Sequence, residues 1–263
     1  INTFLLVEFK GEYNKLAGLI HEIQVFKPGL DFTINIFDPQ NEDTDIYAEK
    51  LVNMLISCQV FSFQEEYSAQ MEKVLIEIIK NVCSDPSRRN WEGFNYYSKK
   101  IQNRMHKNIP YINQTIVSIH NRLRRLKSGP LKPIFETQPK MTLQDVIKKK
   151  IIIDLSNIIR LGGTKEDAVF FANILFNSIW IQNLKHGESQ EIRHFTIIED
   201  SQFFISQKSV RSQVRTNYLE DFALLLRGTG ECLININTRP NISEDIMANA
   251  GVIISFQLSY DQT

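Results

Sequence analysis

The sequence lacks the cysteine and histidine patterns of a disulfide-rich or zinc-binding protein. No CxxC pair occurs, and the three cysteines, Cys58, Cys83 and Cys232, are widely separated and odd in number. We therefore expect three reduced thiols, as in a cytoplasmic protein. The five histidines show no metal-ligand spacing. The sequence gives no reason to expect a metal cluster built from histidine or cysteine.

Membrane signals and an excess of one charge are also missing. No apolar run approaches the roughly 20 residues of a membrane-spanning helix, and the N-terminal segment has no basic leader of the signal-peptide kind. Lys+Arg and Asp+Glu are equal at 30 each, so a surface that contacts DNA would have to be local. The chain starts without Met inside an expected strand, which is typical of a fragment.

The chain contains enough apolar residues to build a hydrophobic core. Hydrophobic residues make up 43% and charged residues 23% of the 263, a balance that excludes a disordered chain. This length allows either one large domain or a core with one insertion.

Apolar, β-favouring segments alternate with helical ones near both ends of the chain. The expected strands are Thr3–Phe9, Asp31–Phe37, Lys150–Leu155, Phe195–Glu199, Cys232–Ile236 and Val252–Leu258. The expected helices are Tyr13–Gln24, Thr164–Leu184, Ser209–Leu226 and Ser243–Ala250. Continuous β-branched runs alternating with helices predict an α/β fold with a mostly parallel sheet covered on both faces.

The middle of the chain has a different character. Residues Thr44–Lys127 show helical periodicity and few strand signals, and Ser128–Lys140 is a connector rich in proline. We therefore predict three parts: a core segment at residues 1–43, an α-helical insertion with its connector at residues 44–140, and a second core segment at residues 141–263.

Two adjacent acids follow the expected strand Phe195–Glu199. In open α/β sheets, ligands bind beyond the carboxyl ends of the strands. There, Glu199 and Asp200 can divide the work of a Walker B segment, one holding Mg²⁺ and the other orienting or deprotonating water. Taken alone, the pair is equally typical of a turn or a helix cap.

Two further segments carry candidate polar groups. Leu233–Pro240, LININTRP, is a strand followed by Thr238 and Arg239, which suits either a phosphate sensor or an ordinary turn. Arg227 precedes Gly228-Thr229-Gly230 and is able to reach a phosphate in a neighbouring subunit. It can equally complement the C-terminal dipole of a helix that glycine ends.

Six segments, in this order, resemble the FtsK–HerA branch of the P-loop ATPases. Phe4–Leu16, containing LLVEFKGEYNKL, resembles the family's "DPHGEYS" strand and turn, and Phe32–Pro39, FTINIFDP, its "NP" strand. IIIDLSNI at residues 151–158 resembles "IDLS", and IIEDSQ at residues 197–202 the Walker B "EEAH". LRGTGECLININTRPNIS resembles "GRKFGVGLLIATQRPS", and GVIISFQL resembles the closing strand.

The resemblance implies a RecA-like sheet flanked by helices, with an α-helical insertion. It implies ATP and Mg²⁺ as cofactors, DNA as a partner, a homo-hexameric ring, and a nuclease or other effector as a further partner. Glu199 would then be the metal-side acid and would bind the nucleotide together with Asp200. Asp200 would also be the catalytic acid, Thr238 and Arg239 the sensor, and Arg227 the arginine finger.

The sequence departs from the family in several places. Asp200 is one methylene shorter than the usual Glu, Thr238 stands where Gln is usual, and Gln202 replaces His. No GxxxxGK[ST] loop occurs in the 263 residues, and this loop is what cradles the phosphates. Either it lies upstream of Ile1, or the protein is a degenerate, non-enzymatic interaction or assembly module. We expect the chain alone to be inactive as an ATPase.

A basic cluster lies at the end of the helical middle part. Its members are Arg122, Arg124, Arg125 and Lys127. These side chains can contact DNA phosphates, but they are equally typical of a solvated helix face.

Overall fold

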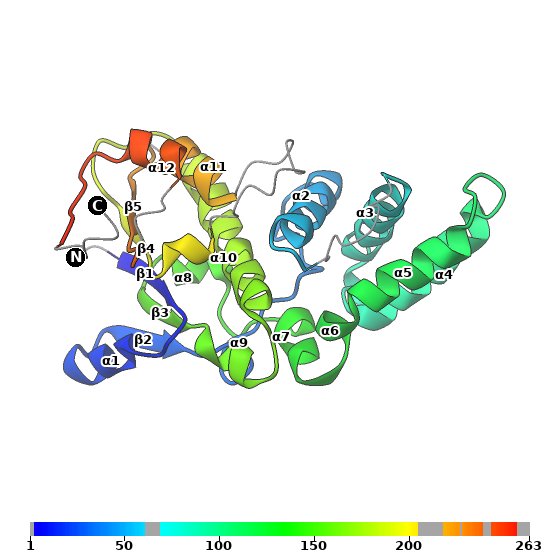
Figure 1. Cartoon of the computed structure of the whole chain (residues 1–263), viewed down its shortest axis with the longest axis horizontal. Helices are drawn as coiled ribbons and strands as arrows, with labels where there is room; N and C mark the ends of the chain where they lie inside the picture. Colours follow the sequence, from blue (N-terminus) through cyan, green and yellow to red (C-terminus); the bar gives the residue numbers. More distant parts are fainter. Residues whose placement is uncertain (1–2, 61–68, 205–217, 227, 239–242, 257–263) are drawn as a thin grey trace, which may run out of the picture. The chain divides into compact units, whose positions relative to one another are not determined.

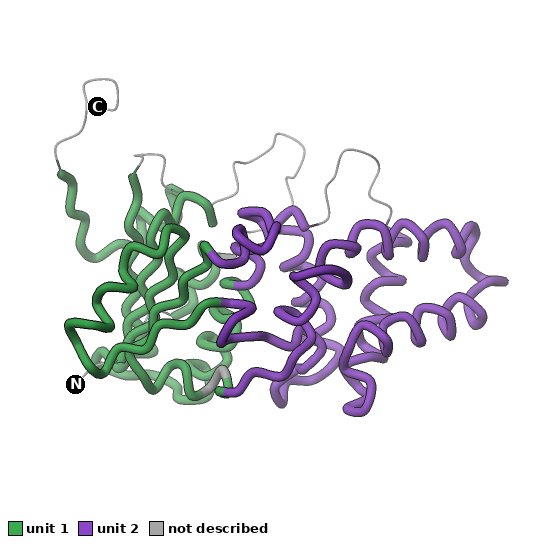
Figure 2. The backbone as a smooth tube through the Cα atoms, turned by 90° about the horizontal axis from the view of Figure 1, so that it is seen from below, with its two compact units in different colours: residues 1–27, 141–156, 172–263 green, residues 28–140, 157–171 purple. Residues whose placement is uncertain are grey.

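The computed structural model describes residues 3–60, 69–204, 218–226, 228–238 and 243–256. The chain divides into two compact units (Figure 2). The first comprises Ile1–Lys27, Met141–Ser156 and Ala172–Thr263, and the second comprises Pro28–Lys140 and Asn157–Phe171. The units are defined by compactness. The division into a core interrupted by residues 44–140 stays a prediction.

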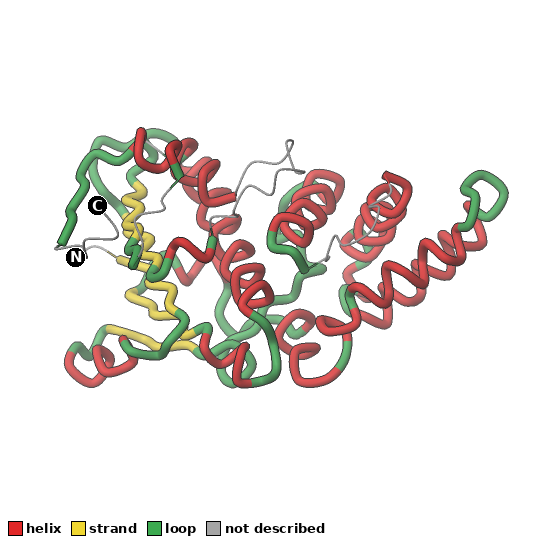
Figure 3. The backbone as a smooth tube through the Cα atoms, viewed as in Figure 1, coloured by secondary structure: helices red, strands yellow, loops and turns green. Residues whose placement is uncertain are grey.

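A five-stranded sheet forms the centre of the first unit (Figures 1 and 3). Its strands are β1 (Thr3–Glu8), β2 (Ile23–Phe26), β3 (Lys150–Asp154), β4 (His194–Ile198) and β5 (Glu231–Asn235). They lie in the order β2-β3-β1-β4-β5, and every pair is parallel. The predicted parallel α/β sheet is therefore confirmed, and the carboxyl ends of all five strands lie at one edge.

Both faces of the central strands are buried, which explains their continuous apolar sequence. On one face Leu6, Ile23 and Ile152 form a cluster, against which Tyr13 and Leu16 pack. Those two side chains come from the 3₁₀ turn η1 (Tyr13–Lys15) and the short helix α1 (Leu16–Leu19). Because neither face meets water, the strands need no polar alternation.

The remaining helices of the first unit surround the sheet (Figure 1). They are α8 (Leu143–Val146), η4 (Ser201–Phe203), α11 (Tyr218–Leu225), α12 (Glu244–Asn249) and most of α10 (Lys165–His186). Phe176 of α10 stacks on Phe204 and on Phe222 of α11, with 5.5 Å between ring centroids in both pairs. This aromatic cluster fixes the segment that follows β4.

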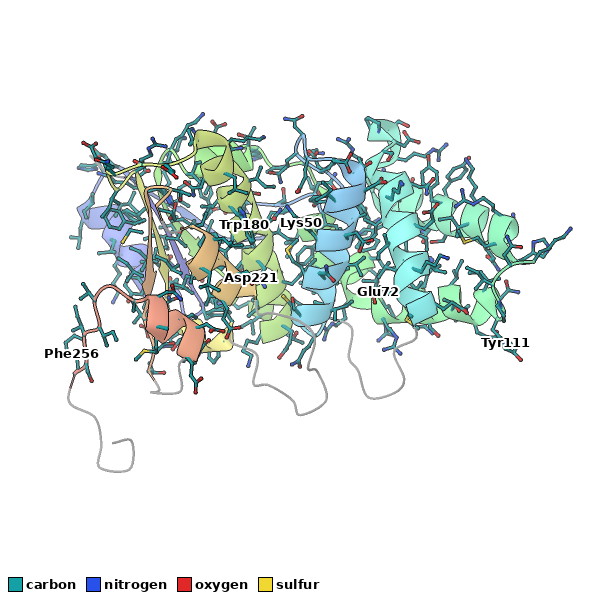
Figure 4. All side chains as sticks on the ribbon, turned by 90° about the horizontal axis from the view of Figure 1, so that it is seen from above. Lys50, Glu72, Tyr111, Trp180, Asp221 and Phe256 are labelled. Atoms are coloured by element: carbon teal, nitrogen blue, oxygen red, sulfur yellow. The ribbon has the colours of Figure 1, made fainter. Side chains whose placement is uncertain are left out.

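The second unit contains helices and no strand in its described part, and its first residues, 28–43, are not helical (Figure 3). It holds α2 (Thr44–Ser57), α3 (Ala69–Cys83), η2 (Pro86–Arg88), α4 (Trp91–Met105), α5 (Ile112–Arg122), α6 (Arg124–Lys127), η3 (Gly129–Leu131), α7 (Lys132–Glu136), most of α9 (Ser156–Arg160) and the start of α10. The helical character predicted for Thr44–Lys127 is confirmed for the described residues of that range, 44–60 and 69–127. The α4–α5 hairpin turns at Tyr111, whose side chain projects into solvent (Figure 4).

The predicted start of α10 is also confirmed, together with its cap. The backbone N–H of Thr164 donates to Asp167 Oδ2 at 2.8 Å, and the N–H of Asp167 donates back to Thr164 Oγ1 at 3.4 Å. The reciprocal bonds of this capping box satisfy two N–H groups that the first turn would leave unpaired.

Three predicted elements are wrong in whole or in part. The helix expected at Tyr13–Gln24 ends at Leu19, and β2 begins at Ile23. The strand expected at Asp31–Phe37 is an extended segment of the second unit, bonded instead to α7: the N–H groups of Ile34 and Ile36 donate to the carbonyls of Ile134 and Phe135. Its apolar side chains Phe32, Ile34 and Ile36 are buried as expected, but so are Asn35 and Phe37, and its hydrogen-bond partner is the backbone of a short helix.

The third correction concerns the last predicted strand, Val252–Leu258. Residues 252–256 form no strand, and their apolar side chains are exposed; Phe256, for example, is 85% exposed (Figure 4). An apolar, β-branched run needs a neighbouring strand to complete its hydrogen bonds. Residues 257 and 258 lie outside the described part of the chain.

Candidate active site

The acidic pair Glu199–Asp200 lies directly beyond the end of β4, at the carboxyl edge of the sheet. Asp200 adopts a left-handed backbone conformation, with φ +50°, which Asp and Asn tolerate better than most residues. The turn is tied to the end of β5, since the N–H of Ser201 donates to the carbonyl of Ile236 at 3.0 Å. The Ser201 hydroxyl also donates to Asn237 Oδ1 at 2.7 Å. Both carboxylates are thereby held in fixed positions.

The segment beyond β5 contributes Thr238 to the same place. Gln202 Nε2 donates to Asp200 Oδ1 at 2.9 Å and to Thr238 Oγ1 at 3.0 Å. The Thr238 hydroxyl itself lies 3.5 Å from Asp200 Oδ1. The structure therefore brings together the predicted site residues Glu199, Asp200 and Thr238, and adds Gln202 as the link between them.

A lysine that the sequence did not point to completes this cluster. Lys10, two residues beyond β1, places Nζ 2.9 Å from Asp200 Oδ2 and 3.7 Å from Glu199 Oε1. Lys10 lies in the segment LLVEFKGEYNKL, one of the six that carry the resemblance, but no role was predicted for it from the sequence. Its neighbour Gly11 has φ +76°, and a Cβ there would lie 3.1 Å from Asp154 Oδ2. Glycine at this position therefore allows the turn to approach β3.

A second pair of carboxylates lies along the same edge, at the ends of β1 and β3. Glu8 is fully buried, and its carboxylate accepts the N–H groups of Glu12 at 2.9 Å and Tyr13 at 3.4 Å. Asp154 accepts from Asn14 Nδ2 at 2.9 Å and from the Ser156 hydroxyl at 2.5 Å. These bonds fasten the turn after β1, so this pair is structural and supports the loop that carries Lys10.

The pKa values of Glu8, Glu199 and Asp200 shift in directions that follow from burial and from their partners. Burial raises the pKa of Glu8, and the nearby Asp154 adds to the rise. Burial also raises the pKa of Glu199, although Lys10 opposes it. For Asp200 burial is outweighed by Lys10 and by the hydrogen bond from Gln202, so its pKa lies below the ordinary value. Asp200 is thus the carboxylate best kept charged near neutral pH.

The acidic pair fits a hard divalent cation in part. Carboxylate oxygens are the ligands that Mg²⁺ prefers. Glu199 Oε2 is buried and has no hydrogen-bond partner among the described residues. The same described residues contain no group of three His, Cys, Asp or Glu side chains able to hold a metal ion. A cation here would complete its shell with water or with phosphate oxygens.

Two predicted site residues, Arg227 and Arg239, lie outside the described part of the chain. The basic cluster at the end of the helical part is described, and two of its members have partners within the second unit. Arg125 Nη2 lies 3.1 Å from Oδ1 of the buried Asp167. Lys127 Nζ lies 2.6 Å from His120 Nδ1 and donates to Asn95 at 3.2 Å.

His120 sits in a half-buried network of its own. Its Nε2 lies 3.1 Å from the Ser98 hydroxyl, and its ring packs 5.4 Å from that of Phe94. Burial and the nearby Lys127 lower the pKa of His120 to about 4. Burial also lowers the pKa of Lys127. A neutral His120 accepts a hydrogen bond from the Lys127 ammonium, so this lysine serves the packing of the second unit.

No protein family model matches the sequence, and no curated protein matches it. Several solved structures resemble the fold, among them VirB4 and TrwB. VirB4 of Thermoanaerobacter pseudethanolicus has a TM-score of 0.61 at 12% identity, covering 90% of this chain and 62% of that one. The bacterial conjugative coupling protein TrwB, in its ΔN70 form with sulphate, has a TM-score of 0.58 at 10% identity, covering 90% and 56%. The chain thus spans less than two thirds of either structure.

At these identities the likeness concerns the fold alone. Together with the all-parallel sheet, it shows that the chain has a RecA-like fold. Within the described residues, no helix has the length and hydropathy needed to cross a membrane.

Proposed function

We propose that this chain is the core of an ATP-driven DNA translocase or helicase motor of the FtsK–HerA kind. One observation carries the proposal. Glu199, Asp200, Gln202 and Thr238 converge at the carboxyl edge of a parallel sheet, with a buried carboxylate oxygen of Glu199 lacking a hydrogen-bond partner among the described residues. In open α/β sheets that edge is where ligands bind.

The residues have separate roles in this proposal. Asp200, which its lowered pKa keeps ionised although it makes a weaker base, orients the attacking water and accepts its proton, and Gln202 and Thr238 orient its carboxylate. Glu199 faces the cation. When bound, Mg²⁺ would neutralise negative charge on the phosphates. Positioning of the acid is the main contribution of this chain, because a shift of about 1 Å can cost roughly a hundredfold in rate.

The remaining parts of the proposal extend beyond the described residues. Arg227 would act on the nucleotide of a neighbouring subunit, and Arg239 would assist Thr238. A homo-hexamer, DNA as the transported partner and a cytoplasmic location complete the proposal, with a nuclease or other effector as a further partner. The likeness in fold to a bacterial conjugative coupling protein supports the RecA-like core that such a motor needs. The four basic residues Arg122, Arg124, Arg125 and Lys127 remain candidates for contact with it.

A second candidate is a non-enzymatic assembly module that keeps the fold. It is favoured by the sequence of the chain, which contains no GxxxxGK[ST] loop, and by Lys10, which already neutralises the acidic pair. In that case the cluster beyond β4 would be a structural ion pair.

Magnesium-dependent ATP hydrolysis by the protein expressed from the whole gene decides between them. Asp200→Asn keeps the size and the left-handed backbone, and should lower kcat by about a hundredfold or more while nucleotide binding persists. Glu244→Gln, at the exposed start of α12, removes one acid outside the cluster and should leave kcat unchanged. Absence of turnover in the wild type, or full activity of Asp200→Asn, would favour the assembly module.

A further inference from the structure

Lys10 is half-exposed, whereas the two carboxylates that it contacts are buried. The exposed fraction of its side chain is 44%, against 10% for Glu199 and 3% for Asp200. One ammonium group that reaches in from solvent therefore neutralises two adjacent buried charges. No other Lys, Arg or His forms an ion pair with this pair of acids within the part of the chain that the structure describes.

Negative charge is in excess around this ammonium group. Its Nζ lies 2.9 Å from Asp200 Oδ2 and 3.7 Å from Glu199 Oε1, so two carboxylates share a single cation. Burying neighbouring carboxylates without a counter-ion is costly. A second positive charge, or a doubly charged replacement for Lys10, would be favoured here.

We propose that Lys10 occupies the place of the divalent cation and competes with it. In the cation-free protein, Lys10 neutralises Glu199 and Asp200; when Mg²⁺ binds, the lysine swings out into solvent. A lysine suits this exchange because its ammonium is compact and strongly hydrated, on a flexible stem. The unpartnered Glu199 Oε2 marks where the incoming cation gains a contact that Lys10 does not make.

The inference rests on the proposed function only in taking Glu199 and Asp200 as the acids that face the cation. It has a direct consequence: the affinity for the cation is set by how readily Lys10 leaves. Removing the charge of Lys10 should tighten cation binding even though the protein loses an ion pair. A purely structural lysine predicts the opposite, since its loss would loosen the acids.

The test is Mn²⁺ binding to the 263-residue chain, followed by electron paramagnetic resonance, with no nucleotide present. Lys10→Met and Lys10→Gln should each lower the Kd for Mn²⁺ by about tenfold or more, because the competing charge is gone. Lys10→Arg keeps a charge and should bind Mn²⁺ no more tightly than the wild type. The matched control is Lys150→Met, which removes a lysine paired with Glu22 at the amino end of β3. It should leave the Kd unchanged.

Thermal unfolding gives a second readout that does not require detectable wild-type binding. Without divalent cation, Lys10→Met should have a lower Tm than the wild type, and Mg²⁺ should raise its Tm more than that of the wild type or Lys150→Met. Adding Glu199→Gln to Lys10→Met should abolish the extra gain. Equal responses to Mg²⁺ in Lys10→Met and Lys150→Met, or weaker Mn²⁺ binding by Lys10→Met, would overturn the inference. ATP turnover is not measured, so a failure of the proposed function would appear separately.

Discussion

Gln202 Nε2 donates a hydrogen bond of 3.0 Å to the hydroxyl of Thr238, and so joins the turn after β4 to the segment after β5. The same nitrogen donates to Asp200 Oδ1 at 2.9 Å. The bridge transmits the position of Thr238 to the acid. If the segment after β5 moved, for instance on contact with a phosphate, the shared Gln202 amide would shift the Asp200 carboxylate as well.

The bridge predicts a graded effect of substitutions at Thr238. Thr238→Val removes the hydroxyl and should lower kcat for ATP in the protein from the whole gene by roughly ten- to a hundredfold, because the acid loses its orientation. Nucleotide affinity should hardly change. Thr238→Ser keeps the hydroxyl and should stay close to the wild type. If both variants hydrolyse ATP equally well, the bridge has no part in catalysis.

A second prediction separates two neighbouring arginines of the basic cluster. Arg125→Ala leaves the buried Asp167 without its ion-pair partner. We expect a loss of about 1 kcal/mol in the free energy of unfolding, less than for a fully buried pair because Arg125 is partly exposed. Arg124→Ala is the matched control and should be close to neutral in urea unfolding. Equal stability of the two variants would show that the ion pair contributes nothing.

Both arginine variants also test the nucleic-acid surface. If Arg124 contacts DNA phosphates, its loss should weaken binding to duplexes of any sequence and reduce the salt dependence of log K by about one. Fluorescence anisotropy at several salt concentrations measures this. An unchanged salt dependence for Arg124→Ala would identify the cluster as an ordinary solvated surface.

His120 predicts how stability depends on pH. Its pKa is lowered from 6.5 to about 4 in the folded protein, so between these values the unfolded chain binds more protons than the folded one. Stability should therefore be fully present above about pH 6.5 and should fall as the pH drops towards 4. His120→Gln should flatten this dependence in urea unfolding, whereas the exposed His106→Gln should not. A wild-type curve that does not change between pH 7 and 5 would contradict the assignment.

The isolated chain should have no measurable Mg²⁺-dependent ATPase activity, because its sequence contains no phosphate-binding loop of the GxxxxGK[ST] type. Phosphate release by the purified 263-residue chain is the measurement. Turnover that Asp200→Ala abolishes would mean that another segment cradles the phosphates.

The sequence predicted the central strands because burial on both faces leaves an unmistakable run of apolar residues. Ile151 to Ile153 and Leu5 to Val7 are such runs. The segment around Ile34 and Ile36 shows the limit of that signal. Its alternating sequence was interpreted as a strand, but the segment is buried on both sides from Ile34 to Phe37 and bonds to the backbone of α7. Periodicity reports which side is buried and not which partner supplies the hydrogen bonds.

The site was predicted only where polar residues stand at the end of a strand. Glu199, Asp200 and Thr238 satisfied that rule, and parallel pairing brought them together. Lys10 was missed because its role depends on contact between segments 190 residues apart in the sequence, which nothing local encodes. The lowered pKa of Asp200 depends on the same contact and therefore could not be predicted from the sequence either.

The left-handed backbone at Asp200 restricts which residues evolution can place there. At φ +50°, glycine, asparagine and aspartate are accommodated most easily, and β-branched side chains are disfavoured. Only aspartate in that short list carries a negative charge. A lineage that gives up hydrolysis can drift to asparagine or glycine without disturbing the turn, whereas one that retains it needs a carboxylate here, either aspartate or the longer glutamate that is usual in the FtsK–HerA proteins. The identity of this one position in related sequences should therefore record whether the acid is still in use.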